Sequence, residues 1–306
     1  MFKKVIFATS ATPGCDGAAR VAFDLAEKYG AEIVLFHVLG IPGKGDSTQV
    51  LDVRTGESVD ADEEYLEGVT EELKTTYAKQ LAKGPRCRIE IAVGAPAREI
   101  LRLARSEDPD LIVMGGATRA EGGLFKRGVT GGSLRKVAKN ARCPVLVVSR
   151  PAASFWGGFS SVLFATDFSR AADSAFQFAL ATARELDAEL HLFHCFDLSH
   201  LQSAMAVSQE GIEDKLAEAR RRLHANYAVP ATAAGLKPTV EVWEGVPYVE
   251  IVKYARERQA DLIVMAHPVR EIDPEVSPFG STFEQVIVRA TCPVASVNRP
   301  DKLPAA

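Results

Sequence analysis

Glycines gather between residues 115 and 133, directly before a stretch with helical spacing. The residues there that suit phosphate binding are Gly115, Gly116, Thr118, Gly131, Gly132 and Ser133. Backbone amides at glycines can approach an anion closely, and a helix N-terminus offers free amides with a favourable dipole. The segment therefore predicts a phosphate site. The alternative is a loop in which the glycines only form turns.

Basic residues surround this segment, which favours the phosphate interpretation. Residues 119–150 contain one acidic residue, Glu121, and eight basic residues: Arg119, Lys126, Arg127, Arg135, Lys136, Lys139, Arg142 and Arg150. Lys126 and Arg127 lie among the glycines themselves, where they can pair with phosphate oxygens.

The second half of the chain has weaker prospects for binding phosphate. Gly280, Ser281 and Thr282 precede its last helical stretch, as Gly132 and Ser133 do in the first half. The loop before them, however, contains three acidic residues between positions 271 and 275, which would repel a polyphosphate.

Candidate ligand groups also follow the first strand of each half. Asp167 follows that strand in the second half, where its carboxylate could accept hydrogen bonds from a ribose or an adenine. Thr9 and Ser10 stand at the corresponding place in the first half, and the backbone of Val38 would lie beside the base. Asp167 also suits a helix N-terminus, and that alternative stays open.

His191, His194 and Cys195 have the side chains of zinc ligands. On a strand, neighbours and residues three apart point to opposite faces, so these three cannot converge on one ion. We therefore expect no metal site, and we expect His194 and its repeat His37 to pack at strand ends. The sequence has neither a recognisable Ser/His/Asp triad nor a Walker lysine motif, so we predict no catalytic residue.

Four short motifs of the first half return in the second half in the same order. They are Phe-Ala-Thr at 7 and 164, Leu-Phe-His at 35 and 192, Asp-Leu-Ile-Val-Met at 110 and 261, and Cys-Pro-Val at 143 and 292. Such a repeat predicts two homologous domains, at residues 1–150 and 159–300. Residues 151–158 then form a linker of Pro, Ala, Ser and Gly character, and residues 301–306 form a tail.

Within each half, short apolar runs alternate with stretches of helical spacing. In the first half these runs cover residues 5–9, 33–39, 89–93, 111–114 and 145–148. Near-continuous Val, Ile and Leu are typical of strands that are buried on both faces. Five such strands alternating with helices predict an α/β fold with a parallel sheet, which binds ligands at the carboxyl ends of its strands.

Composition and charge predict a globular protein of the cytoplasm. Of the 306 residues, 47% are hydrophobic and 25% are charged, and no apolar run approaches the roughly 20 residues of a membrane helix. The net charge of -4 argues against a protein that coats nucleic acid. Five cysteines without a CxxC pair fit a reducing compartment. We therefore expect neither a membrane nor a nucleic acid as a partner.

In their order and repetition these motifs resemble the universal stress protein family, in a tandem two-domain form. The resemblance rests on the repeated motifs, on Ala-Thr-Asp-Phe-Ser at residues 165–169 and on the two Gly-Ser helix starts. It implies two flavodoxin-like, or Rossmann-like, domains of five parallel strands, and in many members the binding of ATP or AMP with little or no turnover. The family's nucleotide pattern is similar to Gly-x2-Gly-x9-Gly-Ser/Thr. Counting back from the Gly-Ser pairs puts its first two glycines at Arg119 and Gly122, and at His267 and Arg270.

Three functions stay open. The first is a non-catalytic stress-response protein that binds adenine nucleotide, ATP or AMP with or without Mg²⁺, mainly through the glycine-rich loop of the first half. The second is an enzyme with at most weak ATP hydrolysis. The third is a degenerate tandem protein without a cofactor, which acts as an interaction scaffold or holds another small ligand. A homodimer and an unidentified regulatory protein partner are further expectations.

Overall fold

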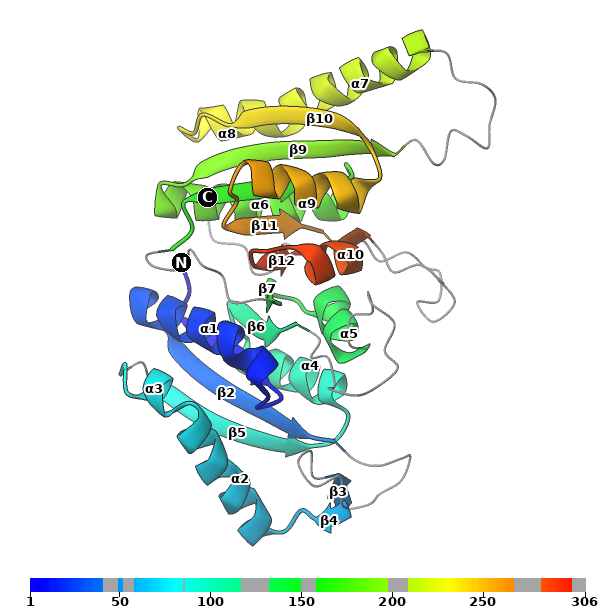
Figure 1. The fold of residues 1–306 in the computed structure, drawn as a ribbon. Coiled ribbons are helices and arrows are strands. Elements are labelled where there is room, and N and C mark those ends of the chain that lie inside the picture. Colours follow the sequence, from blue (N-terminus) through cyan, green and yellow to red (C-terminus); the bar gives the residue numbers. More distant parts are fainter. Residues whose placement is uncertain are drawn as a thin grey trace. The chain divides into compact units, whose positions relative to one another are not determined.

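The computed structural model describes residues 1–40, 49–51, 58–84, 86–116, 132–149, 158–197, 209–266 and 282–298. These residues divide into two units. One holds the described residues from Phe2 to Ser149, and the other holds those from Gly158 to Asn298 (Figure 1). Each unit is a parallel sheet with helices on both faces, so the predicted fold class is confirmed.

The sheet of the first half contains the five strands predicted from the apolar runs. They are β1 (Lys4–Thr9), β2 (Glu32–Leu39), β5 (Cys87–Val93), β6 (Leu111–Gly115) and β7 (Val145–Val148). Their order is β5-β2-β1-β6-β7, and all neighbours are parallel. The chain moves outward from β1 on one side and then restarts at β6 on the other, so the order reverses between β1 and β6. Ligands of this fold bind at such a switch point.

Helices cover both faces of this sheet. They are α1 (Asp16–Tyr29), α2 (Glu63–Thr76), α3 (Ala78–Leu81), α4 (Pro96–Glu107) and α5 (Gly132–Asn140). A 3₁₀ turn, Pro13–Cys15, leads into α1, which packs on β1 and β6, whereas α4 and α5 pack together on the opposite face (Figure 1). Pro96 occupies the first turn of α4, where its missing N–H costs nothing. Gly30 ends α1 in the left-handed conformation that favours glycine.

The segment between β2 and β5 holds the expected helical part, α2 and α3, and a hairpin that the apolar pattern did not predict. In this short antiparallel hairpin β3 (Gln49–Leu51) pairs with β4 (Ser58–Asp60), before α2. Asp62 caps α2 by accepting a hydrogen bond from the backbone amide of Tyr65 at 2.9 Å. Only Leu73 of α2 is buried, which explains why its hydrophobic pattern is weak.

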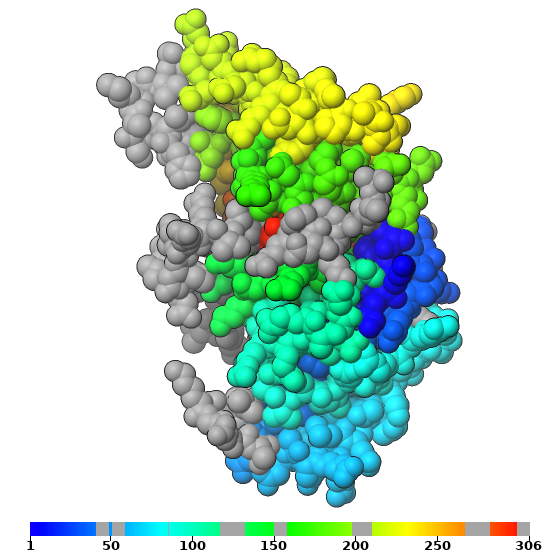
Figure 2. All heavy atoms as spheres, turned by 180° about the vertical axis from the view of Figure 1, so that it is seen from behind, coloured from blue at the N-terminus to red at the C-terminus, as the bar shows by residue number. Residues whose placement is uncertain are grey.

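The second half repeats the same architecture. Its strands are β8 (Ser161–Ala165), β9 (Glu189–Asp197), β10 (Thr239–Gly245), β11 (Leu262–Met265) and β12 (Val294–Ser296), in the order β10-β9-β8-β11-β12. Its helices are α6 (Arg170–Leu186), α7 (Gln209–Leu223), α8 (Val229–Ala233), α9 (Pro247–Glu257) and α10 (Thr282–Arg289), with a π-helical turn, His224–Ala228, between α7 and α8. Seen from behind, Figure 2 shows α4 at the surface of the first half and the α7–α8 segment at the surface of the second.

The central strands form the core of each unit. Val5, Ile6 and Phe7 in β1 are fully buried, as are Val162, Leu163 and Phe164 in β8. Burial on both faces is what near-continuous apolar runs require, so the core follows directly from the sequence pattern.

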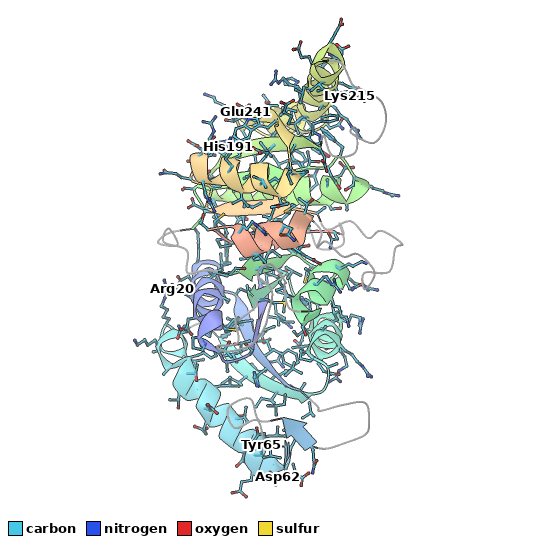
Figure 3. All side chains as sticks on the ribbon, turned by 45° about the vertical axis from the view of Figure 1, so that its right-hand side comes forward. Arg20, Asp62, Tyr65, His191, Lys215 and Glu241 are labelled. Carbon is cyan, nitrogen blue, oxygen red and sulfur yellow. The ribbon has the colours of Figure 1, made fainter. Side chains whose placement is uncertain are left out.

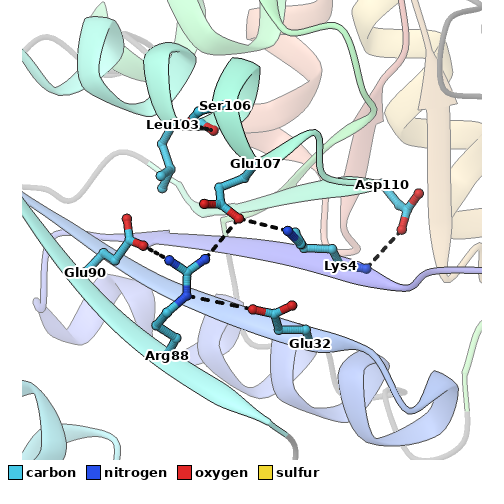
Figure 4. A network of polar contacts seen from close by, with 8 residues as sticks. All are labelled: Lys4, Glu32, Arg88, Glu90, Leu103, Ser106, Glu107 and Asp110. Carbon is cyan, nitrogen blue, oxygen red and sulfur yellow. Dashed lines mark hydrogen bonds and ion pairs between the residues drawn. The ribbon is translucent and has the colours of Figure 1, made fainter.

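Charged residues join the amino ends of the strands in the first half (Figure 4). The Oε2 atom of Glu107 lies 2.8 Å from Nζ of Lys4 and 3.0 Å from Nη2 of Arg88, which also pairs with Glu90. The hydrogen bond with Glu107 raises the pKa of Lys4, and the same bond lowers the pKa of Glu107. This network lies at the edge of the sheet opposite the switch-point edge, so it holds the strands without contributing to a ligand site.

Candidate functional site

The predicted site residues of the first half meet at the carboxyl ends of β1, β2 and β6. Thr9 is the last residue of β1 and Ser10 follows it, while Gly115 ends β6 and Gly116 follows that. Thr9 pairs in register with His37 of β2, beside Val38. Gly132 and Ser133 begin α5. These residues therefore lie on both sides of the switch point. Thr118, Gly131, Gly280 and Ser281 lie outside the described residues.

Thr9 makes three hydrogen bonds, two through its Oγ1 and one through its carbonyl oxygen. Its Oγ1 lies 2.5 Å from the hydroxyl of Tyr77 and accepts a hydrogen bond from the backbone amide of Ala11 at 2.9 Å. Its carbonyl oxygen accepts a hydrogen bond from Nδ1 of His37 at 2.9 Å. Ala11 adopts a left-handed backbone with φ of 56°, which is unfavourable for a residue with a Cβ. The hydrogen bonds of Thr9 hold that turn, and Ser10 lies within it.

The second half repeats this arrangement with a threonine, a tyrosine and a histidine at the corresponding places. The Oγ1 of Thr166 donates to the hydroxyl of Tyr227 at 3.3 Å and accepts from the amide of Phe168 at 2.9 Å. The carbonyl of Thr166 accepts from Nδ1 of His194 at 2.8 Å. Phe168 has φ of 59°, matching Ala11. Both histidines therefore pack at strand ends, as predicted, and each donates to the carbonyl of a threonine at the end of the neighbouring strand or directly after it.

Burial sets the ionisation of these groups. It lowers the pKa of His37 and of His194, since a charged imidazole is disfavoured away from water. Because Nδ1 donates to a carbonyl, the neutral rings carry their proton on that nitrogen. Burial likewise raises the pKa of Tyr77 well above its usual range and that of Tyr227 to about 12. Both tyrosines are therefore neutral hydroxyls near pH 7.

Asp167 takes part in the turn before α6. Its Oδ1 accepts a hydrogen bond from the backbone amide of Ser169 at 2.9 Å, and Ser169 in turn caps α6 by accepting from the amide of Ala172 at 3.3 Å. The alternative in which Asp167 shapes a helix N-terminus is thus present in the structure. One carboxylate oxygen has this contact, so the residue stays a candidate ligand of the second half.

The glycines of the first half differ in what surrounds them. A Cβ on Gly115 would lie 3.0 Å from Sγ of Cys15, and a Cβ on Gly116 would lie 2.6 Å from Cα of Ser149. Close packing therefore accounts for both glycines without any ligand. Gly132 is exposed and has no atom within 4 Å of the Cβ position. Of these three glycines, only Gly132 has room for a side chain beside the backbone.

A groove of about 950 Å³ opens along α2 and β4 in the first half. Among the described residues that line it, four are acidic, Asp60, Asp62, Glu64 and Glu72, and none is basic. Figure 3 shows two lining residues, Asp62 and Tyr65, near the start of α2. The acidic lining would repel a phosphate, so this groove does not suit the polyphosphate of a nucleotide.

The residues considered as zinc ligands do not form a metal site. His191 lies on β9 with its Nδ1 3.4 Å from the hydroxyl of Tyr254, under α9 (Figure 3). Within the described part of the chain, no group of three His, Cys, Asp or Glu side chains is arranged to hold an ion. Burial raises the pKa of the Cys195 thiol to about 12, which disfavours the thiolate that a metal needs.

Sequence reasoning missed the two tyrosines. Tyr77 and Tyr227 lie 68 and 61 residues beyond their threonine partners, so local spacing gives no hint of either contact. A signal was nevertheless present. Leu-x3-Tyr-Ala occurs at residues 73–78 and again at residues 223–228, an offset of 150 that fits the repeat.

Each half is thus a doubly wound α/β domain whose polar groups gather at the switch point. The model of the universal stress protein family matches residues 1–149 and again residues 158–298. The chain belongs to the universal stress protein family, with two family domains in tandem.

Individual relatives match one domain at a time or the whole tandem. A universal stress protein of Methanocaldococcus jannaschii is 34% identical over 145 residues, covering 47% of this chain and 85% of that protein. One from Bacillus subtilis is 30% identical over 156 residues, covering 48% of this chain and 99% of that protein. A solved universal stress protein from Archaeoglobus fulgidus has the same fold at 21% identity, with a TM-score of 0.69 over 97% of this chain and 98% of the other.

No helix in the described ranges combines the length and the hydropathy required to cross a bilayer.

Proposed function

We propose that the first half binds one adenine nucleotide, ATP or AMP, and holds it without turnover as part of a stress response. The observation that carries this proposal is the meeting of Thr9, Ser10 and Gly115 at the switch point, together with the start of α5 at Gly132, whose Cβ position is open. Free amides at a helix start favour a phosphate, and strand-end polar groups suit a ribose or a base. Val38 in β2 would lie beside the base, and ATP would bring Mg²⁺ with it.

The second half is proposed as the weaker or silent copy. Asp167 already binds the amide of Ser169, and Thr282 begins the shorter helix α10 after an acidic loop sequence. An acidic loop disfavours a polyphosphate. The proposed stoichiometry is therefore one nucleotide per chain.

The test begins with a freshly purified sample. The protein is denatured, any released small molecule is identified by mass spectrometry, and the protein freed of ligand is titrated with ATP in a calorimeter, with and without Mg²⁺. We expect adenine nucleotide near one per chain and no release of ADP or phosphate over hours. A sample that holds no nucleotide and gives no heat of binding would refute the proposal.

Gly132→Glu tests the assignment of the site. The Cβ position is open, so the fold tolerates the side chain, but the carboxylate would stand where the phosphate is expected and should weaken ATP binding at least ten-fold. Thr282→Glu is the matched control, because it puts the same charge into the first turn of α10 in the second half. If Gly132→Glu and wild type bound ATP with equal affinity, the assignment of the phosphate site to the start of α5 would be wrong.

A second candidate function is favoured by one observation. Gly115 and Gly116 are accounted for by packing against Cys15 and Ser149. If packing alone keeps these glycines, the protein is a scaffold that holds a protein partner or another small ligand. Indifference to ATP together with a normal unfolding transition is the result expected of that scaffold.

A further inference from the structure

We propose that Tyr77 is a positioning residue for the nucleotide site of the first half, acting through Thr9 on the turn that carries Ser10. The inference rests on the proposed function, since it assigns a residue to that same site. Tyr77 does not itself stand at the strand ends. It comes from the segment between α2 and α3, where its backbone amide bonds to the carbonyl of Leu73.

The first argument is the position of the hydroxyl. Tyr77 is 1% exposed and its ring packs edge-on against Phe7, with centroids 5.5 Å apart. A phenylalanine would satisfy that packing. The buried hydroxyl would be costly unless it had a partner, and its partner is the Oγ1 of Thr9, at 2.5 Å. The hydroxyl therefore serves Thr9 and not the core.

The second argument is what Thr9 then does. With Tyr77 on one side, Oγ1 of Thr9 is oriented to accept the amide of Ala11, the residue in the left-handed conformation. The chain reverses there, and the hydroxyl of Ser10 is left 3.0 Å from Oγ1 of Thr12 and 3.3 Å from Sγ of Cys15. Cys15 is the residue that also crowds Gly115 across the switch point. Tyr77 thus fixes which way the strand-end polar groups face.

The third argument is the duplication. In the second half, the amide of Phe168 donates to Oγ1 of Thr166, which donates to the hydroxyl of Tyr227. That hydroxyl in turn donates to Oδ1 of Asp173 at 3.0 Å. Tyr227 comes from a π-helical turn, whereas Tyr77 follows an ordinary α-helix. The backbone around Tyr77 differs from that around Tyr227, yet both tyrosines make the same contact with a threonine. The contact therefore serves the turn at the strand end and is not a by-product of the helix that carries the tyrosine.

The experiment compares two conservative variants with wild type. Tyr77→Phe removes the hydroxyl and keeps the ring, and Tyr227→Phe makes the same change in the second half as the matched control. Each protein is titrated with ATP in a calorimeter, and the exchange of the Ala11 amide with deuterium is followed by NMR or mass spectrometry.

We expect Tyr77→Phe to weaken ATP binding about ten-fold, the size associated with one buried hydrogen bond, and to speed exchange at Ala11 by a similar factor. Tyr227→Phe should leave ATP affinity within two-fold of wild type. A merely structural role would lower the melting temperature of Tyr77→Phe without moving the affinity, and that result would overturn the inference.

Failure of the proposed function gives a different pattern. If wild type binds no ATP, the nucleotide proposal fails, and exchange at Ala11 still judges the contact. Faster exchange in Tyr77→Phe than in Tyr227→Phe would support the control of the turn by Tyr77. Equal exchange in wild type and Tyr77→Phe would overturn it whether or not ATP binds.

Discussion

The aspartates that precede β6 and β11 tie these strands to the start of β1 and β8. In the second half, Oδ2 of Asp261 accepts hydrogen bonds from the amide of Ser160 at 2.9 Å, from its hydroxyl at 2.5 Å and from the amide of Ser161 at 3.1 Å. In the first half, Oδ2 of Asp110 accepts only from the amides of Lys3 and Lys4, at 2.7 and 2.9 Å. We predict that Asp261→Ala destabilises its half more than Asp110→Ala does.

The magnitude follows from which donors can reach water. A hydrogen bond to a charged acceptor contributes about 1.5–3 kcal/mol, and a buried donor without a partner costs about 1–3 kcal/mol. Ser161 is buried, whereas Ser160 is exposed, so one donor of Asp261 loses its partner outright and two are partly rescued by solvent. We expect a loss of about 3 kcal/mol for Asp261→Ala. For Asp110→Ala, where Lys3 is exposed, we expect about 1–2 kcal/mol.

The assay is chemical unfolding of the full chain, and calorimetry is the second measurement. The chain has two tryptophans, so a Trp156→Phe background leaves Trp243 of β10 to report on the second half. Asp261→Asn is the control, because it keeps one carbonyl oxygen for the Ser161 amide. Equal losses at both aspartates, or a larger loss at Asp110, would refute the argument from burial.

Three further predictions concern pH, packing and thiol reactivity. Burial lowers the pKa of His37, so below about pH 6.5 the unfolded chain binds a proton that the folded chain does not, and the free energy of unfolding falls as the pH drops. His37→Gln should therefore reduce the fall in melting temperature between pH 7.5 and pH 5.5. Gly116→Ala should lower the free energy of unfolding by about 1–3 kcal/mol, because its Cβ would overlap Ser149, whereas Gly132→Ala should leave it unchanged. An equal effect of the two variants on urea unfolding would contradict this. Burial raises the pKa of Cys87 to about 11 and of Cys292 to about 12, so iodoacetamide at pH 8 should label both far more slowly in the native protein than after unfolding, as read by mass spectrometry.

The sequence predicted the features that depend on local pattern. Runs such as residues 5–9 and 111–114 are apolar without alternation because both faces of β1 and β6 are buried, and the five strands of the first half follow from that rule. The repeat predicted the second half from the first. The switch point then followed from strand order, with Thr9 and Gly115 at its two sides.

What the sequence could not predict depends on contacts between distant residues. A glycine required for the approach of a ligand looks the same in the sequence as one required for packing, and only the position of Ser149 reveals the second cause at Gly116. Local spacing does not mark Tyr77 as a contact of the strand end, because its partner Thr9 is 68 positions away. The hairpin of β3 and β4 is too short to leave a periodic signal.

The two threonine-centred turns also separate framework from chemistry. Thr9, His37 and Tyr77 have direct counterparts in Thr166, His194 and Tyr227, yet the residue carried by the turn changes from Ser10 to Asp167. The helical residue five positions before each tyrosine changes sign, from Glu72 to Arg222. The tandem chain therefore presents the same threonine-centred turn twice, with different charges around it. Exchanging those two residue pairs between the halves would separate the contribution of these charges from that of the turn itself.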